Sequence, residues 1–351
     1  MSGGVDSSVV PILLMEKGYD VVGITMQIWQ ESQTDPRHAG CCSLGAVEDA
    51  RRVASILGFP HYVINFKEEF KSAVIEEFIA EYELGRTPNP CVTCNTKVKF
   101  NALLKAAREL GLEKLATGHY ARIRRNSKTG AYRLMKALGT GKDQSYVLYG
   151  MNQDQLSASM FPLGELGDKA ETRRLAREAG LPVADKPDSQ DICFVSEAGG
   201  YREFLRKSKP DIFSDGQLVS TSGEVLGAHH GVADFTIGQR RGLGVAAGRP
   251  LYVIGLEPKS NRVVVGSEES LFSKKVYLTE VNWSEGVMPS EPIPVMAKIR
   301  YNMDPKKAIL HPGETPWLEF IEPVRAVTPG QAAVAYRGST LAAGGKILAG
   351  S

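Results

Sequence analysis

The sequence predicts an α/β N-terminal domain built on a parallel sheet, followed by a small mixed or β-rich central domain and a C-terminal β-barrel. Three observations support this fold class. Strand and helix patterns alternate over roughly the first 195 residues. Glycine-rich turns and short alternating runs replace them afterwards. A glycine- and serine-rich loop opens the chain at residues 2–8. The 351 residues suit two or three domains at about 150 residues each, and we predict limits at 1–198, 199–268 and 269–351.

The elements of the first half follow from hydrophobic periodicity. The patterns predict helices over residues 9–17, 46–57 and 100–110, and helical spacing at Phe70, Val74, Phe78, Ile79 and Tyr82. Strands are predicted over 21–26, 61–66 and 115–119. In a parallel sheet with helices on both faces, ligands bind at the carboxyl ends of the strands. The opening loop has no strand before it, so we expect that Met1 is internal in the natural gene and that a short hydrophobic strand precedes it.

The second half reads as antiparallel sheet or small barrel. Its short alternating runs are separated by turn residues. They predict strands over residues 251–256, 262–266, 276–278, 295–300 and 332–336.

Composition excludes several classes of protein. The chain is 42% hydrophobic and 23% charged, as expected for folded globular domains rather than disorder. No apolar run reaches the roughly 20 residues of a membrane helix, and the N-terminus lacks a signal-peptide pattern. A formal net charge of +2 means that any RNA-binding surface must be local. Five cysteines are too few for a disulfide scaffold, so we expect a cytoplasmic protein whose cysteines bind metal or react.

The loop at residues 2–8, S-G-G-V-D-S-S, is the strongest local motif. Gly3 and Gly4 permit close approach of the backbone to a phosphate, and the following helix directs N–H groups at an anion. Serine hydroxyls add donors, and Asp6 could hold Mg²⁺. The loop lacks the lysine of a Walker motif. It resembles the pyrophosphate-binding loop of the ATP pyrophosphatases.

Cysteines mark two further segments. Cys91 and Cys94 follow a Pro-Asn-Pro turn just before a helix, where the helix N-terminus and nearby lysines would enrich the nucleophilic thiolate. By itself this C-x-x-C pattern fits redox, metal or cluster chemistry. Cys193 lies about a hundred residues later in a polar loop, so only folding could bring it to Cys94.

Basic and polar segments suggest contacts with phosphate groups. Arg240 and Arg241 lie in a glycine-rich loop, and Arg122, Arg124, Arg125, Arg133 and Lys136 form a basic patch on an expected hairpin. His119 follows a predicted strand, where it could simply cap that strand. Lys142 and Asp143 could simply form a solvated turn.

Taken in order, the motifs resemble those of the tRNA-specific 2-thiouridylases across nearly the whole chain. The resemblance is carried by S-G-G-V-D-S-S, G-C-C-S with E-D-A-R-R-V-A, P-N-P-x-x-x-C-N-x-x-x-K-F, A-T-G-H-Y-A, K-D-Q-S-Y, D-S-x-x-I-C-F, T-I-G-Q-R-R-G-L-G, K-I-R-Y and A-V-T-P-G-Q.

The resemblance implies an adenine nucleotide alpha hydrolase-like N-terminal domain and an enzyme that exchanges the C2 oxygen of the wobble uridine of tRNA for sulfur. ATP would adenylate that oxygen, and pyrophosphate would leave. A persulfide on Cys193 would deliver sulfur, with Cys94 as the partner nucleophile. Residues that would bind ATP are Ser2, Gly3, Gly4, Val5, Asp6, Ser7, Ser8, Met26 and Gly118. Asn89, Pro90 and Cys91 would meet the target base. Further tRNA contacts would come from His119, Lys142, Asp143, Gln144, Arg300, Tyr301 and Gln331, and we add Arg240 and Arg241.

Cys91 departs from the family pattern, because many members carry Asp at this position. Together, Cys91, Cys94 and Cys193 could bind three irons of a 4Fe–4S cluster whose fourth iron carries sulfide. The alternative is a persulfide relay, with a disulfide between cysteines and Cys91 as a bystander. The sulfur donor is left open: a cysteine desulfurase, a sulfur-relay protein or free sulfide.

Three rival functions remain at this point. A ligase that adenylates a small carboxylate would use the same loop without Cys94 and Cys193. A tRNA 4-thiouridine synthase is a nearer relative, but the sequence shows no appended N-terminal RNA-binding domain. A catalytically silent RNA-binding protein would bind tRNA with strong salt dependence and leave ATP intact.

Overall fold

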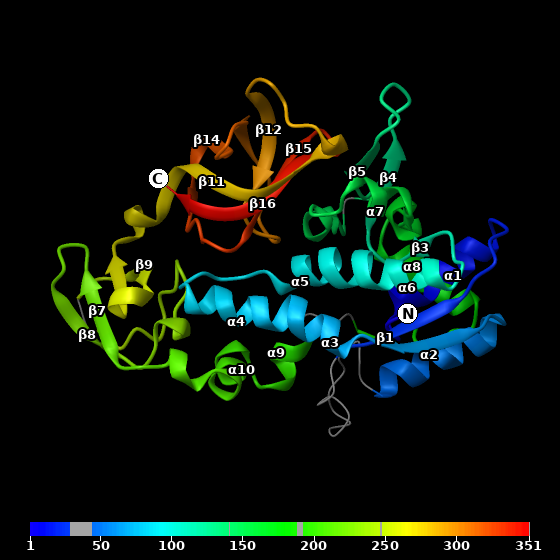
Figure 1. Ribbon diagram of the computed structural model, residues 1–351, viewed down its shortest axis with the longest axis horizontal. Coiled ribbons are helices and arrows are strands. Elements are labelled where there is room, and N and C mark those ends of the chain that lie inside the picture. The colour runs from blue at the N-terminus through cyan, green and yellow to red at the C-terminus, as the bar shows by residue number, and fades with distance from the viewer. Residues whose placement is uncertain (29–43, 140, 188–191, 246–247, 351) are drawn as a thin grey trace.

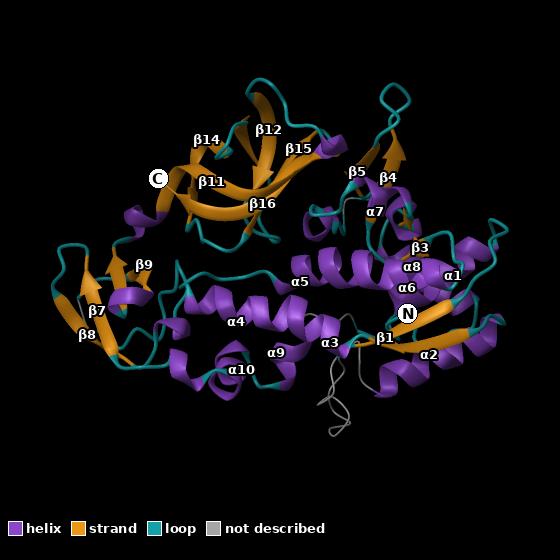
Figure 2. Ribbon diagram, viewed as in Figure 1, coloured by secondary structure: helices purple, strands orange, loops and turns teal. Residues whose placement is uncertain are grey.

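The N-terminal half consists of short parallel strand pairs covered by helices (Figures 1 and 2). The computed structural model describes residues 1–28, 44–139, 141–187, 192–245 and 248–350. Strands β1 (Gly23–Gln27) and β2 (His61–Asn65) pair in parallel, as do β3 (Leu115–Ala116) and β6 (Ser159–Met160). The α-helices of this half are α1 (Val5–Met15), α2 (Leu44–Leu57), α3 (Lys67–Phe70), α4 (Glu76–Glu83), α5 (Pro90–Thr93), α6 (Leu104–Glu109), α7 (Gln153–Ser157), α8 (Lys169–Glu178), α9 (Cys193–Glu197) and α10 (Tyr201–Ser208).

Two helical rods form the centre of the molecule. In the first, a π-helical turn η2 (Lys71–Ile75) joins α3 to α4, and in the second η3 (Cys94–Leu103) joins α5 to α6. Both run through the middle of Figure 1, with α9 and α10 beneath α4. Phe70 and Phe78 of the first rod pack edge-on against Phe194 of α9, and Phe100 of the second is fully buried. The predicted helical spacing over Phe70–Tyr82 is therefore confirmed.

The second half is β-rich, as predicted. A four-stranded sheet has the order β8-β7-β10-β9, and six further strands close into a barrel in the order β11-β14-β13-β12-β15-β16, where β16 pairs back to β11. The predicted fold class is thereby confirmed, with the parallel strands of the first half forming two separate pairs rather than one sheet. The strands are β7 (Gly216–Ser220), β8 (Val225–His229), β9 (Tyr252–Glu257), β10 (Arg262–Gly266), β11 (Phe272–Trp283), β12 (Ile293–Lys298), β13 (Lys306–His311), β14 (Trp317–Arg325), β15 (Ala332–Arg337) and β16 (Thr340–Gly350).

A hairpin from the first half extends the sheet of the barrel. The expected basic hairpin is confirmed as β4 (Ala121–Arg125) paired with β5 (Tyr132–Lys136), and Met135 of β5 pairs with Thr340 of β16. The main hydrophobic core crosses the same junction, because Ala332, Val334 and Tyr336 of β15 pack with helix residues of the first half. Residues of β15 therefore complete the core of the first half, while the barrel also has a separate core of its own.

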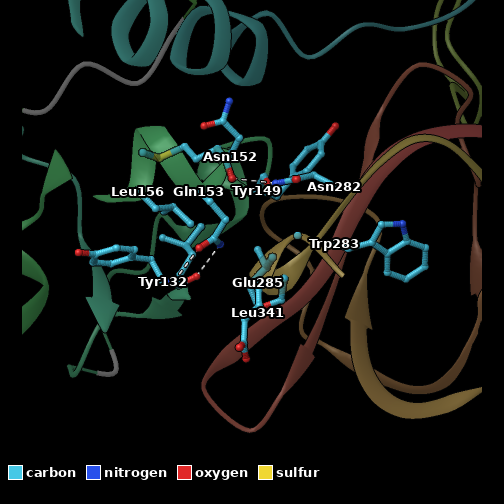
Figure 3. Close-up of a pocket in the computed structure, with 13 residues that line it drawn as sticks. Tyr132, Tyr149, Asn152, Gln153, Leu156, Asn282, Trp283, Glu285 and Leu341 are labelled. Atoms are coloured by element: carbon cyan, nitrogen blue, oxygen red, sulfur yellow. Dashed lines mark hydrogen bonds between the residues drawn. The ribbon is translucent and has the colours of Figure 1, made fainter. Parts of the chain in front are cut away.

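Glu285 fastens this hairpin to the end of β11. Its carboxylate accepts hydrogen bonds from Asn126, Thr129 and Arg133, at 2.8, 2.5 and 2.6 Å. The hydrogen bond from Thr129, opposed by partial burial and reinforced by those from Asn126 and Arg133, lowers the pKa of Glu285. Beside it lies a cavity of about 60 Å³, well below the roughly 300 Å³ of a small-molecule site. In Figure 3, the Gln153 side chain forms hydrogen bonds with the backbone of Tyr132 beside this cavity. These lining residues hold the hairpin in place.

Among the described helices, none combines the length and the apolar character needed to cross a bilayer.

Candidate active site

The loop before α1 makes a left-handed turn at Gly3 that packs closely against α2. Gly3 has φ +63°, and a Cβ there would lie 2.2 Å from the carbonyl oxygen of Ala46, in the first turn of α2. Only glycine meets both demands. Ser7 and Ser8 donate from Oγ to the carbonyl of Gly4, at 3.1 and 2.9 Å. The loop is thus held by its own hydroxyls, and its helix begins at Val5.

Asp6 collects three donors from distant parts of the chain. Tyr120 Oη and Lys169 Nζ donate to Oδ1 at 2.8 and 2.5 Å, and Lys142 Nζ donates to Oδ2 at 3.1 Å. The carboxylate is only 23% exposed. The predicted Mg²⁺ site on Asp6 does not fit this arrangement, because a divalent cation would face two ammonium groups on an already engaged carboxylate.

Two consecutive residues, Gly118 and His119, join the loop at residues 2–8 to the helical rod that carries Cys94. A Cβ on Gly118 would lie 2.8 Å from the carbonyl carbon of Asp6, so its backbone packs directly on the start of α1. The ring of His119 packs against Phe100 and Phe161, at 5.9 and 5.8 Å between centroids. Burial, with the charges of Lys99 and Lys142, holds the pKa of His119 well below its usual 6.5. The imidazole is therefore neutral at pH 7, and its Nδ1 lies 2.8 Å from Thr117 Oγ1.

The segment expected to meet the target base is a capped helix start. The Asn89 side chain accepts from the amide of Val92, and buried Pro90 occupies the first helical turn, where its missing N–H costs nothing. Cys91 is exposed in that turn, while Cys94 is partly buried one turn later. The side chain of Asn89 thus caps the helix, and the thiol nearest to it in the sequence, Cys91, faces solvent.

Gln331 of the barrel holds the backbone of this same segment. Its side-chain amide donates to the carbonyls of Thr87 and Pro88, at 2.9 and 3.0 Å. The amide of Thr87 in turn donates to the carbonyl of Pro329 at 2.9 Å. Although the family resemblance implies a tRNA contact for Gln331, its amide group is here committed to positioning the loop before Asn89.

Cys193 begins α9, and it packs, like Cys94, against the main hydrophobic core. Folding thus places both cysteine segments on one core. Among the described residues no three His, Cys, Asp or Glu side chains are grouped to hold a metal ion, so Cys91, Cys94 and Cys193 do not form a ready cluster site. Cys41 and Cys42, and the Asp188–Asp191 part of the motif before Cys193, lie outside the described residues.

The segment 142–144, expected to touch tRNA, is engaged within the protein. Lys142 reaches Asp6. Asp143 accepts from the amides of Ala137 and Ser145, at 3.3 and 3.2 Å, and Gln144 bonds the Tyr120 backbone in both directions. Gln144 thus holds the backbone just after Gly118 and His119.

The remaining expected tRNA contacts lie on the barrel and in the loop between β8 and β9. Tyr301 is 38% exposed, with Lys298 Nζ 5.3 Å from its ring centroid. Arg300 donates to the carbonyl of Ala326 at 2.7 Å, and burial lowers its pKa, with Arg325 adding to the effect. Arg240 and Arg241 are exposed. Met26, which was expected to bind ATP rather than tRNA, is half-buried on β1.

Three family models match the chain in succession. They are described as the tRNA methyl transferase HUP domain over residues 1–197, the tRNA methyl transferase PRC-barrel domain over 202–267, and the aminomethyltransferase beta-barrel domain over 273–347. The tRNA-specific 2-thiouridylase MnmA of Heliobacterium modesticaldum is 49% identical over 99% of this chain and 91% of its own length. The chain belongs to the tRNA-specific 2-thiouridylase family. The enzyme of the same description from Clostridioides difficile is 46% identical over 99% of this chain and 96% of its own.

A solved structure is more distant. It is described as the U34-tRNA thiolase NcsA from Methanococcus maripaludis with its 4Fe–4S cluster, and it is 18% identical, with a TM-score of 0.34 over 60% of this chain and 65% of that one. At this level of likeness it supports no inference about the cysteines of this family member.

Sequence reasoning missed two lysines at the nucleotide loop. Lys169 pairs with Asp6, and Lys186 Nζ donates to the carbonyl of Gly3 at 3.1 Å while pairing with Asp49 at 2.8 Å. Both lie over 160 positions from the loop in sequence, and neither stands in a local motif. Their contacts arise only from the packing of α8 and the segment after it.

Replacing Gln331 with Met is expected to loosen the loop before Asn89. Methionine has nearly the same volume but no donor, so the carbonyls of Thr87 and Pro88 lose their hydrogen bonds, at a cost of about 1–3 kcal/mol. Amide hydrogen exchange over residues 85–95 should accelerate, and unfolding should occur at a lower temperature. Exposed Gln217, changed to Met in parallel, should alter neither. Unchanged exchange over residues 85–95 would contradict the positioning role.

Proposed function

We propose that the protein exchanges the C2 oxygen of the wobble uridine of tRNA for sulfur in an ATP-dependent reaction. One structural observation carries the proposal. Gly118 packs on the nucleotide loop, and the adjoining His119 packs on the helix that bears Cys94, so a nucleotide at the loop and a base at that helix would be neighbours. The family relationship supplies the chemistry, and favours neither the carboxylate ligase nor the silent RNA-binding protein.

The loop Ser2–Ser8, with Gly118 and Met26 beside it, would bind ATP. Uridine O2 would attack the α-phosphorus, and the bond to the bridging oxygen would break with its electron pair leaving on pyrophosphate, while the N3 proton passes to solvent. Adenylation converts a poor leaving group into AMP. Any Mg²⁺ would arrive on the phosphates, since Asp6 is engaged by Lys142 and Lys169.

Sulfur would then be delivered through cysteine chemistry. The terminal sulfur of a Cys193 persulfide attacks C2 and AMP leaves. The Cys94 thiolate then attacks Cys193 Sγ and forms a Cys94–Cys193 disulfide. The bond between Sγ and the transferred sulfur breaks, so that sulfur stays on C2 of the base. An external thiol reduces that disulfide, and a sulfur donor reloads Cys193. We carry this route forward rather than the cluster, because the described cysteines are not grouped as ligands. Domain limits at 1–198, 199–268 and 269–351, and a cytoplasmic location, remain our predictions.

Nucleoside mass spectrometry tests the reaction. Unmodified tRNA is incubated anaerobically with protein, ATP, a dithiol and a cysteine desulfurase with cysteine, because sulfide alone cannot form a persulfide on a reduced cysteine. We expect a wobble uridine whose mass increases by an oxygen-to-sulfur exchange, dependent on ATP and abolished in Cys193→Ser. The mass of an added methyl group, or an unmodified base despite ATP binding, would overturn the proposal.

Cys91→Ser separates the two sulfur routes. The relay predicts that this variant retains thiolation and that the active wild-type protein contains no iron. Loss of thiolation together with bound iron in the anaerobic wild-type protein would instead establish the cluster.

A further inference from the structure

The loop at residues 2–8 contains no cation of its own, but the fold brings lysines to it, and two of them, Lys142 and Lys169, pair with Asp6. Lys142 lies in the turn before the 3-10 helix η4 (Ser145–Leu148), and Lys169 is the first residue of α8. Their ammonium groups converge on the carboxylate of Asp6, in the first turn of α1, at 3.1 and 2.5 Å. In Figure 1, α1, α8 and β3 gather at one end of the molecule.

We propose that Lys142 and Lys169 form a clamp for the pyrophosphate part of ATP. This inference rests on the proposed function and deepens it: it names Lys169 as a nucleotide-binding residue, and it gives Lys142 a phosphate contact beyond the tRNA contact that the family implies.

Charge favours a polyanion at this position. The two lysines exceed the single charge of Asp6 by one, and the clamp lies at the N-terminus of the 11-residue helix α1, whose dipole adds positive potential. Most of the negative charge of ATP lies on its β- and γ-phosphates. The ammonium groups therefore match the leaving group better than they match AMP.

Burial and packing preorganise both cations. Lys142 is 24% exposed and Lys169 is 22% exposed, so charge interactions there are less screened than at the surface. Their Nζ atoms lie 4.9 and 6.0 Å from the ring centroid of Tyr120, whose hydroxyl bonds both Asp6 and Thr172. Tyr120 and Asp6 thus hold the two ammonium groups in place before any nucleotide binds, which limits the entropy lost on binding.

Calorimetric titration with ATP, pyrophosphate and AMP tests the clamp. In Lys169→Met we expect affinity for ATP and pyrophosphate to fall about 10- to 100-fold, the value of a charged hydrogen bond, with AMP affected less than about threefold. Lys169→Arg should recover most of the loss. Lys142→Met carries the same expectation, so the test survives if one variant fails to fold. The control is Lys114→Met, an exposed lysine at the opposite end of β3 that bonds only the Ser157 carbonyl among the contacts described.

The outcomes separate this inference from the function beneath it. Equal ATP affinity in wild type and both Met variants would overturn the clamp. So would a loss of AMP affinity as large as the loss of ATP affinity, because the lysines would then act only by holding Asp6. Retained ATP affinity with weakened tRNA retention would mark the lysines as RNA contacts. A folded wild-type protein that binds neither ATP nor pyrophosphate would instead overturn the proposed function.

Discussion

Gly3→Ala is expected to abolish ATP binding and thiolation, whereas Gly4→Ala should leave the fold intact. Alanine at position 3 would have to adopt φ +63° and place its Cβ 2.2 Å from the Ala46 carbonyl oxygen, so α2 or the loop must move. We expect a loss of about 2–4 kcal/mol in the free energy of unfolding, which for a domain of this size lowers the Tm by roughly 5–10 °C. Thermal unfolding and ATP titration measure both effects.

Gly4 is the matched control because it is the adjacent glycine in the same loop. Its φ is −99°, and the atom nearest to an added methyl group would be Ser2 Oγ at 3.7 Å. A Gly3→Ala protein with wild-type Tm and ATP affinity would show that the loop relaxes without cost, contrary to the close contact between Gly3 and Ala46.

Lys346→Met is expected to weaken the attachment of the barrel to the catalytic half. Lys346 on β16 pairs with Glu77 and Glu81 of the first helical rod, at 3.2 and 3.5 Å, and with Glu280 at 3.1 Å. It is only 16% exposed, so its removal leaves poorly solvated carboxylates with fewer partners. We expect a loss of about 1–3 kcal/mol near neutral pH, measured by denaturant unfolding. Lys97→Met removes a 55% exposed partner of the same Glu77 and should cost less than about 1 kcal/mol.

The effect of Lys346→Met should shrink in acid. Burial raises the pKa of Glu77, but the hydrogen bond from Lys97 and the charge of Lys346 outweigh it and lower the pKa below 4.5. A lowered carboxyl pKa contributes stability that is present above 4.5 and is lost as the pH falls through the folded-state pKa. Wild type and variant should therefore converge as acid protonates Glu77. A gap that widens in acid would contradict this assignment.

Local patterns predicted most elements of the fold, because periodicity and turn residues act over short range. The helix predicted over 9–17 corresponds to α1, and the hairpin around Arg125 and the strands β9, β10, β11, β12 and β15 follow their own sequence. The barrel strands β13, β14 and β16 were not predicted. The single parallel sheet expected from the alternating pattern is instead two separate strand pairs, β1–β2 and β3–β6. The pairing of Met135 with Thr340 was not predicted, because strand register between distant segments depends on the packing of the whole core.

The candidate site also combines local motifs that the sequence predicts with distant contacts that it does not. The glycines of the opening loop and the Pro-Asn-Pro turn before Cys91 belong to local motifs that the sequence displays. Lys169 and the commitment of Gln331 to the Thr87 and Pro88 carbonyls could not be predicted, since their partners lie more than 160 residues away. The two lysines that pair with Asp6 could not be foreseen for the same reason, because no residue near Asp6 in the sequence indicates them.

The shared sheet between hairpin and barrel has a consequence for synthesis of the chain. Met135 leaves the ribosome about 200 residues before Thr340, its pairing partner, and at ~5–20 residues per second this interval lasts roughly 10–40 s. Throughout it, the apolar surface that Val334 and Tyr336 will cover has no partner, and the Thr87–Pro88 turn lacks Gln331. The nascent first half would therefore be a natural client for chaperones, and the helix start with Cys91 and Cys94 would be held in place only when the last strands emerge.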